Sequence, residues 1–125
     1  MHLFDSNILI YHLNDALPPG VLGKVERWIT EGALISVITR IEVMGYPQAE
    51  TQRRQASRLL SLFDEVALQG PVVERTIDVR RRHRIRLPDA VIAATALVYG
   101  ASLITRNRRD FQSIDGLQVI DPFSG

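Results

Sequence analysis

The sequence predicts an α/β fold in three layers, in which a mostly parallel central sheet lies between two layers of helices. Short apolar runs of β-type residues alternate along the chain with longer segments of helical periodicity. Strands separated by helices are typical of parallel sheets that are covered on both faces. The chain has 125 residues, 46% of them hydrophobic, and shows no repeat, linker or low-complexity tract. We therefore expect a single domain over residues 1–125.

The predicted strands are short and apolar. They cover residues 3–4, 33–37, 66–68, 102–104 and 118–120. The segments between them carry apolar residues at helical spacing. The predicted helices cover residues 7–13, 18–31, 39–45, 48–63, 71–84 and 89–99.

Two of these helices have distinct start signals. Thr39 and Glu42 fit a capping box at the start of the helix over 39–45. Pro88 suits the first turn of the last helix, and Gly100 suits its end. Because that helix is apolar almost all round, we expect it to lie buried in the centre of the fold.

Four acidic residues lie near the ends of predicted strands or at the starts of helices. They are Asp5, Glu42, Asp89 and Asp110. Ligands of open α/β sheets bind beyond the carboxyl ends of the strands, so we expect all four acids to meet at one edge of the sheet. Carboxylates within a few ångströms of one another resist ionising together, and a divalent cation relieves that repulsion.

Neutral oxygen-bearing side chains accompany these acids. They are Ser6, Asn7, Thr105 and Asn107. An all-oxygen environment of this kind suits Mg2+ or Mn2+ rather than zinc or copper.

Each acid also has a purely structural interpretation. Asp5 can be a helix N-cap, and Glu42 can simply complete the capping box with Thr39. Asp89 is favourable at the positive end of a helix, and Asp110 is typical of a solvated turn. The joint placement favours a site, because four independent caps need not share one sheet edge.

The charge of the chain is nearly balanced at +1, so net charge does not identify a nucleic-acid-binding protein. The arginines are nevertheless clustered, and arginine is a good planar partner of phosphate. The candidates for contact with a phosphate backbone are Arg80, Arg82, Arg84, Arg86 and Arg106. A solvated surface is the competing interpretation for each of them.

The chain contains no cysteine, which excludes disulfides, thiolate metal sites and cysteine nucleophiles. With His2 included, the first strand candidate (2–4) begins directly after Met1, so we expect no signal peptide. The longest apolar stretch, 90–98, is far shorter than the roughly 20 residues that span a bilayer. We therefore expect a soluble cytoplasmic protein without a membrane partner.

Four segments of the chain, taken together, resemble a PIN domain. They read FDSNI (4–8), SVITRIEVMGYP (36–47), LPDAVIAAT (87–95) and LITRNRRDF (103–111). The resemblance is to the VapC-like and FitB-like toxins of prokaryotic toxin–antitoxin pairs, and it spans nearly the whole chain in the family's order. It implies a PIN-like fold, an Mg2+- or Mn2+-dependent endoribonuclease with RNA as its substrate, and a cognate antitoxin protein that inhibits it.

The resemblance also implies roles for individual residues. Asp5 and Asp89 match acidic positions and are expected to hold the metal, while Glu42 matches a third and is expected to orient or deprotonate a water molecule. Many members have an acid where Asn107 stands, so the fourth role falls either to this neutral residue or to Asp110.

Supporting and partner-binding segments follow from the same resemblance. Thr105 and Asn107 are expected to hydrogen-bond the acids or the substrate, and Ser6 and Asn7 are expected to present hydroxyl, amide and backbone donors. Helices 18–31 and 48–63 are expected to form a homodimer interface or a groove for the antitoxin tail, where an inserted arginine would block metal binding.

Two rival classes compete with this interpretation. Haloacid-dehalogenase-like phosphatases and response-regulator receivers also place an aspartate after the first strand, but they use a lysine near the phosphate, and Lys24 lies in the wrong segment. A degenerate PIN domain that only binds RNA or protein is the other rival. The acids Asp5, Glu42 and Asp89 argue against it, whereas the neutral Asn107 keeps it open.

Overall fold

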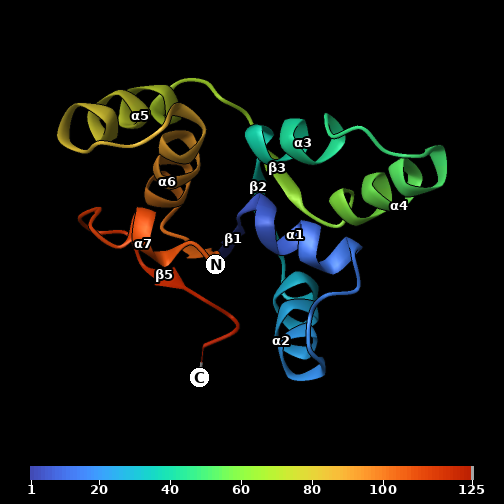
Figure 1. Ribbon diagram of the computed structural model, residues 1–125. Helices are drawn as coiled ribbons and strands as arrows, with labels where there is room; N and C mark the ends of the chain where they lie inside the picture. Colours follow the sequence, from blue (N-terminus) through green and yellow to red (C-terminus); the bar gives the residue numbers. More distant parts are fainter. Residues whose placement is uncertain (125) are drawn as a thin grey trace.

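The computed structural model describes residues 1–124 and confirms the α/β class (Figure 1). The strands are β1 (His2–Phe4), β2 (Ala33–Ser36), β3 (Asp64–Val66), β4 (Ser102–Ile104) and β5 (Val119–Ile120). The helices are α1 (Ser6–Leu13), α2 (Pro19–Thr30), α3 (Val37–Met44), α4 (Glu50–Leu60), α5 (Pro71–Arg82), α6 (Leu87–Tyr99) and α7 (Arg108–Phe111). These strands form one sheet in the order β3-β2-β1-β4-β5, and each neighbouring pair is parallel.

The two faces of the sheet are buried under different helices. Side chains alternate between the faces of a strand, so each central strand supplies apolar residues to both layers. The face under α5, α6 and α7 receives Leu3, Leu34 and Leu103, and the face under α1, α2, α3 and α4 receives Phe4, Ile35 and Ile104. Figure 1 shows the two groups of helices on opposite sides of the strands, which confirms the three-layer prediction.

Helix α6 is the most deeply buried helix of the fold, as its composition predicts. Ala90, Ala93, Ala94 and Ala96 are fully buried, so small side chains let the helix pack close to the sheet. The helix ends at Gly100, which adopts the left-handed conformation (φ 63°) that glycine accommodates without steric cost.

The predicted capping box at Thr39 is wrong. Helix α3 begins two residues earlier, at Val37, and Ser36 is its N-cap, with Oγ accepting a hydrogen bond from the backbone N–H of Ile38 (3.1 Å). Ser36 ends a strand in extended conformation and offers the short hydroxyl that an N-cap needs. Thr39 is therefore a buried residue within the helix, and its hydroxyl has no hydrogen-bond partner among the described residues.

Most other boundaries differ from prediction by one or two residues, and α7 was not predicted. The larger differences concern β3 and the end of α4. Strand β3 lies at Asp64–Val66 rather than at 66–68. Asp64 and Glu65 are exposed on this edge strand, where polar side chains are tolerated, and Glu65 pairs with Arg40. Helix α4 ends at Leu60 rather than at residue 63, although Phe63 remains buried.

Within residues 1–124, no helix combines the length and the apolar character needed to cross a membrane.

Candidate active site

Asp5 lies at the carboxyl end of β1, directly before α1. Its backbone N–H donates to the carbonyl of Ile104 at the end of β4 (2.9 Å), so neighbouring strands fix its position. One carboxylate oxygen accepts from the backbone N–H of Ser6 (2.8 Å), which makes Asp5 the N-cap of α1. Asp5 can therefore serve both as an N-cap and as a site residue, because its other carboxylate oxygen makes separate contacts.

That second oxygen of Asp5 belongs to a hydrogen-bonded network at the end of β4. It accepts from Thr105 Oγ1 (2.8 Å) and, more weakly, from Asn7 Nδ2 (3.4 Å). Thr105 Oγ1 itself accepts from Asn7 Nδ2 (3.1 Å) and from the backbone N–H of Asn107 (3.0 Å). The network joins the first turn of α1 to the loop after β4 and fixes the rotamer of Asp5.

Glu42 reaches the same edge from α3. It lies on the exposed side of that helix, so its side chain does not serve as part of a cap. Its Oε1 accepts a hydrogen bond from the hydroxyl of Ser6, which is the first residue of α1. Ser6 therefore links the two acids, since its backbone N–H donates to Asp5 and its hydroxyl donates to Glu42.

Asp89 reaches the edge from the first turn of α6. Its side chain is only 10% exposed, in agreement with the burial predicted for this helix. Nε and Nη2 of Arg86 both donate to its Oδ2, each at 3.3 Å. Arg86 itself is 76% exposed, so Asp89 presents one side to the interior and is paired on the other with a solvent-facing cation.

The charges of the other two acids act on Asp5. Burial raises the pKa of Asp5 from 3.8 to about 6, although the hydrogen bonds from Thr105 and Ser6 oppose this rise. The negative charges of Asp89 and Glu42 raise the pKa of Asp5 further. Three carboxylates from distant parts of the chain thus share one electrostatic environment at the carboxyl edge of the sheet.

Asn107 and Asp110 form a pair at the border of this group. Asn107 precedes the short helix α7, and its Nδ2 donates to Oδ2 of the exposed Asp110 at 2.7 Å. Through its backbone N–H, Asn107 is also bonded to Thr105. The two candidates for a fourth acidic position are therefore in contact with each other.

The donors at this edge fit a hard divalent cation in kind, since all of them are oxygens. Their spacing is wider than predicted: within residues 1–124, no three His, Asp or Glu side chains lie close enough to hold a metal together. Glu42 and Asp89 instead make hydrogen bonds with Ser6 and Arg86, respectively. Mg2+ retains several water ligands and needs only one or two carboxylates, so Asp5 and Asp89 still suit it.

The predicted phosphate-binding arginines are all exposed, but they lie on different elements. Arg80 and Arg82 belong to the last turn of α5, while Arg84 and Arg86 lie in the connection to α6. Arg82 is paired with Asp78 one turn back in α5 (3.1 Å). Arg84 and Arg86 therefore lie nearer in the chain to Asp89 than the arginines of α5 do.

Two contacts of the site were not predicted. The pair between Arg86 and Asp89 has a sequence signal, namely an arginine and an aspartate at i,i+3 across a helix start. The contact of Arg106 with Tyr11 and Phe123 has none, because these aromatic residues belong to opposite ends of the chain.

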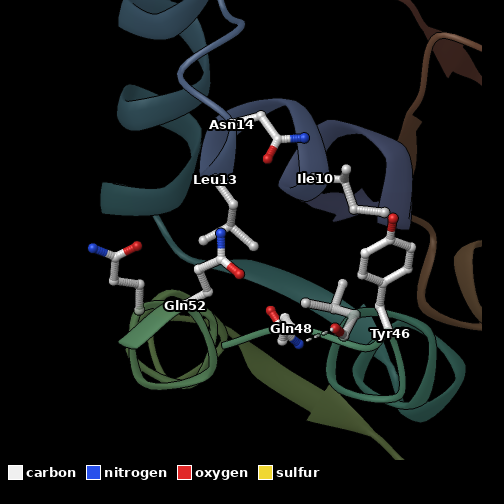
Figure 2. A pocket seen from close by; sticks show the side chains of 8 residues that line it. Ile10, Leu13, Asn14, Tyr46, Gln48 and Gln52 are labelled. Carbon is white, nitrogen blue, oxygen red and sulfur yellow. Dashed lines mark hydrogen bonds between the residues drawn. The ribbon is translucent and has the colours of Figure 1, made fainter. Parts of the chain in front are cut away.

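A hollow of about 420 Å3 lies between α1, α3 and α4 (Figure 2). Its lining includes Ile10, Leu13, Tyr46, Gln48 and Gln52. Ile10 follows Ser6 by one helical turn in α1. Val43, which also lines the hollow, is the residue after Glu42 in α3, and Tyr46 lies just beyond the end of that helix. The hollow is therefore next to the carboxylates along the same two helices, although it contains none of them.

The fold and the site define an α/β domain with interacting carboxylates and neutral oxygen donors at the carboxyl edge of a parallel sheet. The chain belongs to the PIN domain family, whose sequence profile matches residues 3–117. It is 34% identical to ribonuclease VapC10 of Mycobacterium tuberculosis over 134 aligned residues, which cover 99% of this chain and 94% of that protein.

Solved structures agree with this family. A chain of a toxin–antitoxin complex from Klebsiella pneumoniae superposes with a TM-score of 0.75 at 32% identity, and the match covers 98% of both chains. A chain of VapBC2 from Rickettsia felis, in a structure bound to a promoter DNA fragment, superposes with a TM-score of 0.82 at 20% identity. The match covers 95% of this chain and 96% of that chain. The similarity to VapBC2 is a similarity of fold alone. The two solved structures together confirm the predicted PIN-like architecture.

Proposed function

We propose that this chain is a divalent-metal-dependent endoribonuclease and the toxin of a toxin–antitoxin pair. The observation that carries the proposal is the raised pKa of Asp5, which is buried and lies within the electrostatic influence of Asp89 and Glu42. Perturbed carboxylates of this kind are typical of catalytic sites. The similarity to a protein named as a ribonuclease, and to a chain of a toxin–antitoxin complex, supports the same assignment.

In the proposed mechanism, Asp5 and Asp89 hold Mg2+ or Mn2+. When bound, the cation supplies positive charge at the scissile phosphate and lowers the pKa of water. Thr105 and Asn7 keep the Asp5 carboxylate in one orientation through their hydrogen bonds to Oδ2. The position of Asp5 is thus set by the protein before substrate arrives, which lowers the cost of organising the site.

Glu42 is the proposed general base for the attacking water. It is exposed, so water and RNA can reach it, and Ser6 orients its carboxylate by donating a hydrogen bond. The water loses its proton to Glu42 as its oxygen bonds to phosphorus, and the bond from phosphorus to the leaving ribose oxygen breaks. Arg80, Arg84 and Arg86 supply positive charge for the neighbouring phosphates.

The antitoxin is proposed to bind along the hollow between α1, α3 and α4. Helix α4 lies within the segment 48–63 expected to form such a groove, and it lines the hollow through Gln52 and Gln55. Ile10 and Tyr46 are 41% and 70% exposed there, so an apolar segment of a partner would cover them. A cationic side chain at the end of that segment would lie one helical turn from Glu42. The homodimer stays a prediction.

The experiment is an RNA cleavage assay on a mixture of transfer, ribosomal and random-sequence RNA, with Mn2+ and with excess EDTA. We expect cleavage only with the metal, and loss of cleavage in Asp5→Asn and Asp89→Asn. Asp64→Asn is the matched control, because it removes an exposed carboxylate from β3 at the edge of the sheet. Undiminished cleavage in both site variants would refute the mechanism, and RNA binding without cleavage would favour the non-catalytic PIN domain.

A further inference from the structure

Arg106 lies against two neighbouring aromatic residues at the border of the acidic site. Its guanidinium carbon lies 3.9 Å from the centre of the Phe123 ring and 5.4 Å from that of Tyr11. Its Nη1 also donates to the hydroxyl of Tyr11 (3.3 Å), and the two rings lie 5.4 Å apart. We call Arg106, Tyr11 and Phe123 the aromatic clamp.

The aromatic clamp is tied to the catalytic carboxylate through Asn7. The backbone N–H of Arg106 donates to Asn7 Oδ1 (3.4 Å). The amide nitrogen of the same Asn7 side chain donates to Asp5 Oδ2 and to Thr105 Oγ1. Two successive hydrogen bonds therefore connect the backbone of Arg106 to the Asp5 carboxylate, which places the clamp next to the acidic site.

The clamp differs from the other aromatic contacts of the structure. The rings of Phe4 and Phe63 pack against each other in the buried core. Within residues 1–124, Arg106 is the one arginine that lies over an aromatic ring. Arg106 remains exposed although its guanidinium lies over the ring of Phe123, so part of the side chain is accessible to a ligand.

We propose that the aromatic clamp is a stacking platform for one unpaired nucleobase of the RNA strand beside the scissile phosphate. The proposal rests on the proposed ribonuclease function. A planar guanidinium stacks on bases as it does on aromatic rings, whereas an ammonium group does not. The contacts to Tyr11 and Phe123 hold the guanidinium in place beforehand, so less side-chain entropy is lost when a base stacks on it.

This platform selects single-stranded RNA. A base in a duplex is stacked and paired, and it reaches the clamp only after it has been displaced. Stacking tolerates every base, so the platform contributes affinity and register rather than a fixed sequence.

The test compares binding of two strands of equal length and charge, in EDTA: a single-stranded RNA and an abasic sugar–phosphate strand. We expect the wild-type protein to prefer the strand with bases by about tenfold. Arg106→Lys keeps the charge but removes the planar face, and Phe123→Leu keeps an apolar side chain but removes the ring, so both should lose this preference. Arg109→Lys, an exposed arginine of α7, is the matched control and should retain it.

The results separate the platform from the proposed function. Unchanged preference in Arg106→Lys, or no preference in the wild-type protein, would overturn the platform whether or not RNA is cleaved. Melting curves show whether Phe123→Leu is folded. If it is not, the base preference of Arg106→Lys alone tests the platform. Failure of the wild-type protein to cleave RNA with Mn2+ would refute the ribonuclease assignment through a separate measurement.

Discussion

Neutralising Asp5 is expected to stabilise the metal-free protein while it abolishes the proposed activity. Asp5 is 7% exposed, and burial raises its pKa to about 6 from 3.8. Ionisation of this carboxylate therefore costs more free energy in the folded chain than in the unfolded chain. Asp5→Asn removes the charge and retains an oxygen that can accept from the backbone N–H of Ser6, so the N-cap of α1 is preserved.

The size and the pH dependence of the effect follow from the two pKa values. The difference between 3.8 and about 6 corresponds to about 3 kcal/mol once Asp5 is ionised in both states. The stabilising contribution of the protonated carboxyl is complete below about pH 4 and is lost as the pH rises through about 6. The advantage of Asp5→Asn should thus be small in acid and approach a few kcal/mol near neutral pH.

Urea unfolding of the wild-type protein and of Asp5→Asn, at about pH 4 and about pH 7.5 in EDTA, measures this difference. The exposed Asp64→Asn serves as the control and should show no comparable change with pH. Saturating Mn2+ should reduce the advantage of Asp5→Asn, because only the wild-type protein gains binding free energy. An Asp5→Asn advantage that does not grow between the two pH values would refute the cost assigned to the buried charge.

Two further changes test contacts around the site. Arg86→Gln removes the cation that pairs with Asp89, and we expect calorimetry to show Mn2+ binding strengthened several-fold, whereas Arg82→Gln, which breaks the pair with Asp78, should leave it unchanged. Equal affinities in the two variants would mean that Arg86 does not compete with the metal. Thr39→Val replaces a buried hydroxyl that has no partner, so urea unfolding should show unchanged stability or a gain of about 1 kcal/mol. A loss of more than about 1 kcal/mol would indicate an unrecognised hydrogen bond of Thr39.

Strong local signals predicted the central elements of the fold well. Pro88 lies in the first turn of α6 and Gly100 ends it, as predicted, although the helix begins at Leu87 rather than at residue 89. The capping box failed because Ser36, three residues before Thr39, offered a competing N-cap, and only the end of β2 decides between the two. Strand β3 was misplaced because an edge strand carries exposed charged residues, so its composition does not mark it as a strand.

The positions of site residues could be predicted where the topology of the sheet alone determines them. Residues that follow β1 and β4 must share an edge because the strands are parallel, so Asp5 and Thr105 were expected together. Hydrogen bonds between side chains depend on rotamers and on distant segments, and sequence patterns do not encode them. The contact of Arg106 with Phe123 belongs to this second kind. Ser6 was expected to act as a donor at the site, but its particular partner, Glu42, was not specified.

The close packing of α6 lets buried alanine side chains influence the position of the Asp89 carboxylate. Asp89 stands in the first turn of a helix whose buried face consists mainly of alanine and valine. A larger side chain at Ala93 or Ala94 would push the helix away from the sheet and carry the carboxylate with it. Evolution can therefore adjust the geometry of the acidic edge through buried methyl groups in the protein interior, without replacing any of the residues proposed to bind RNA or metal.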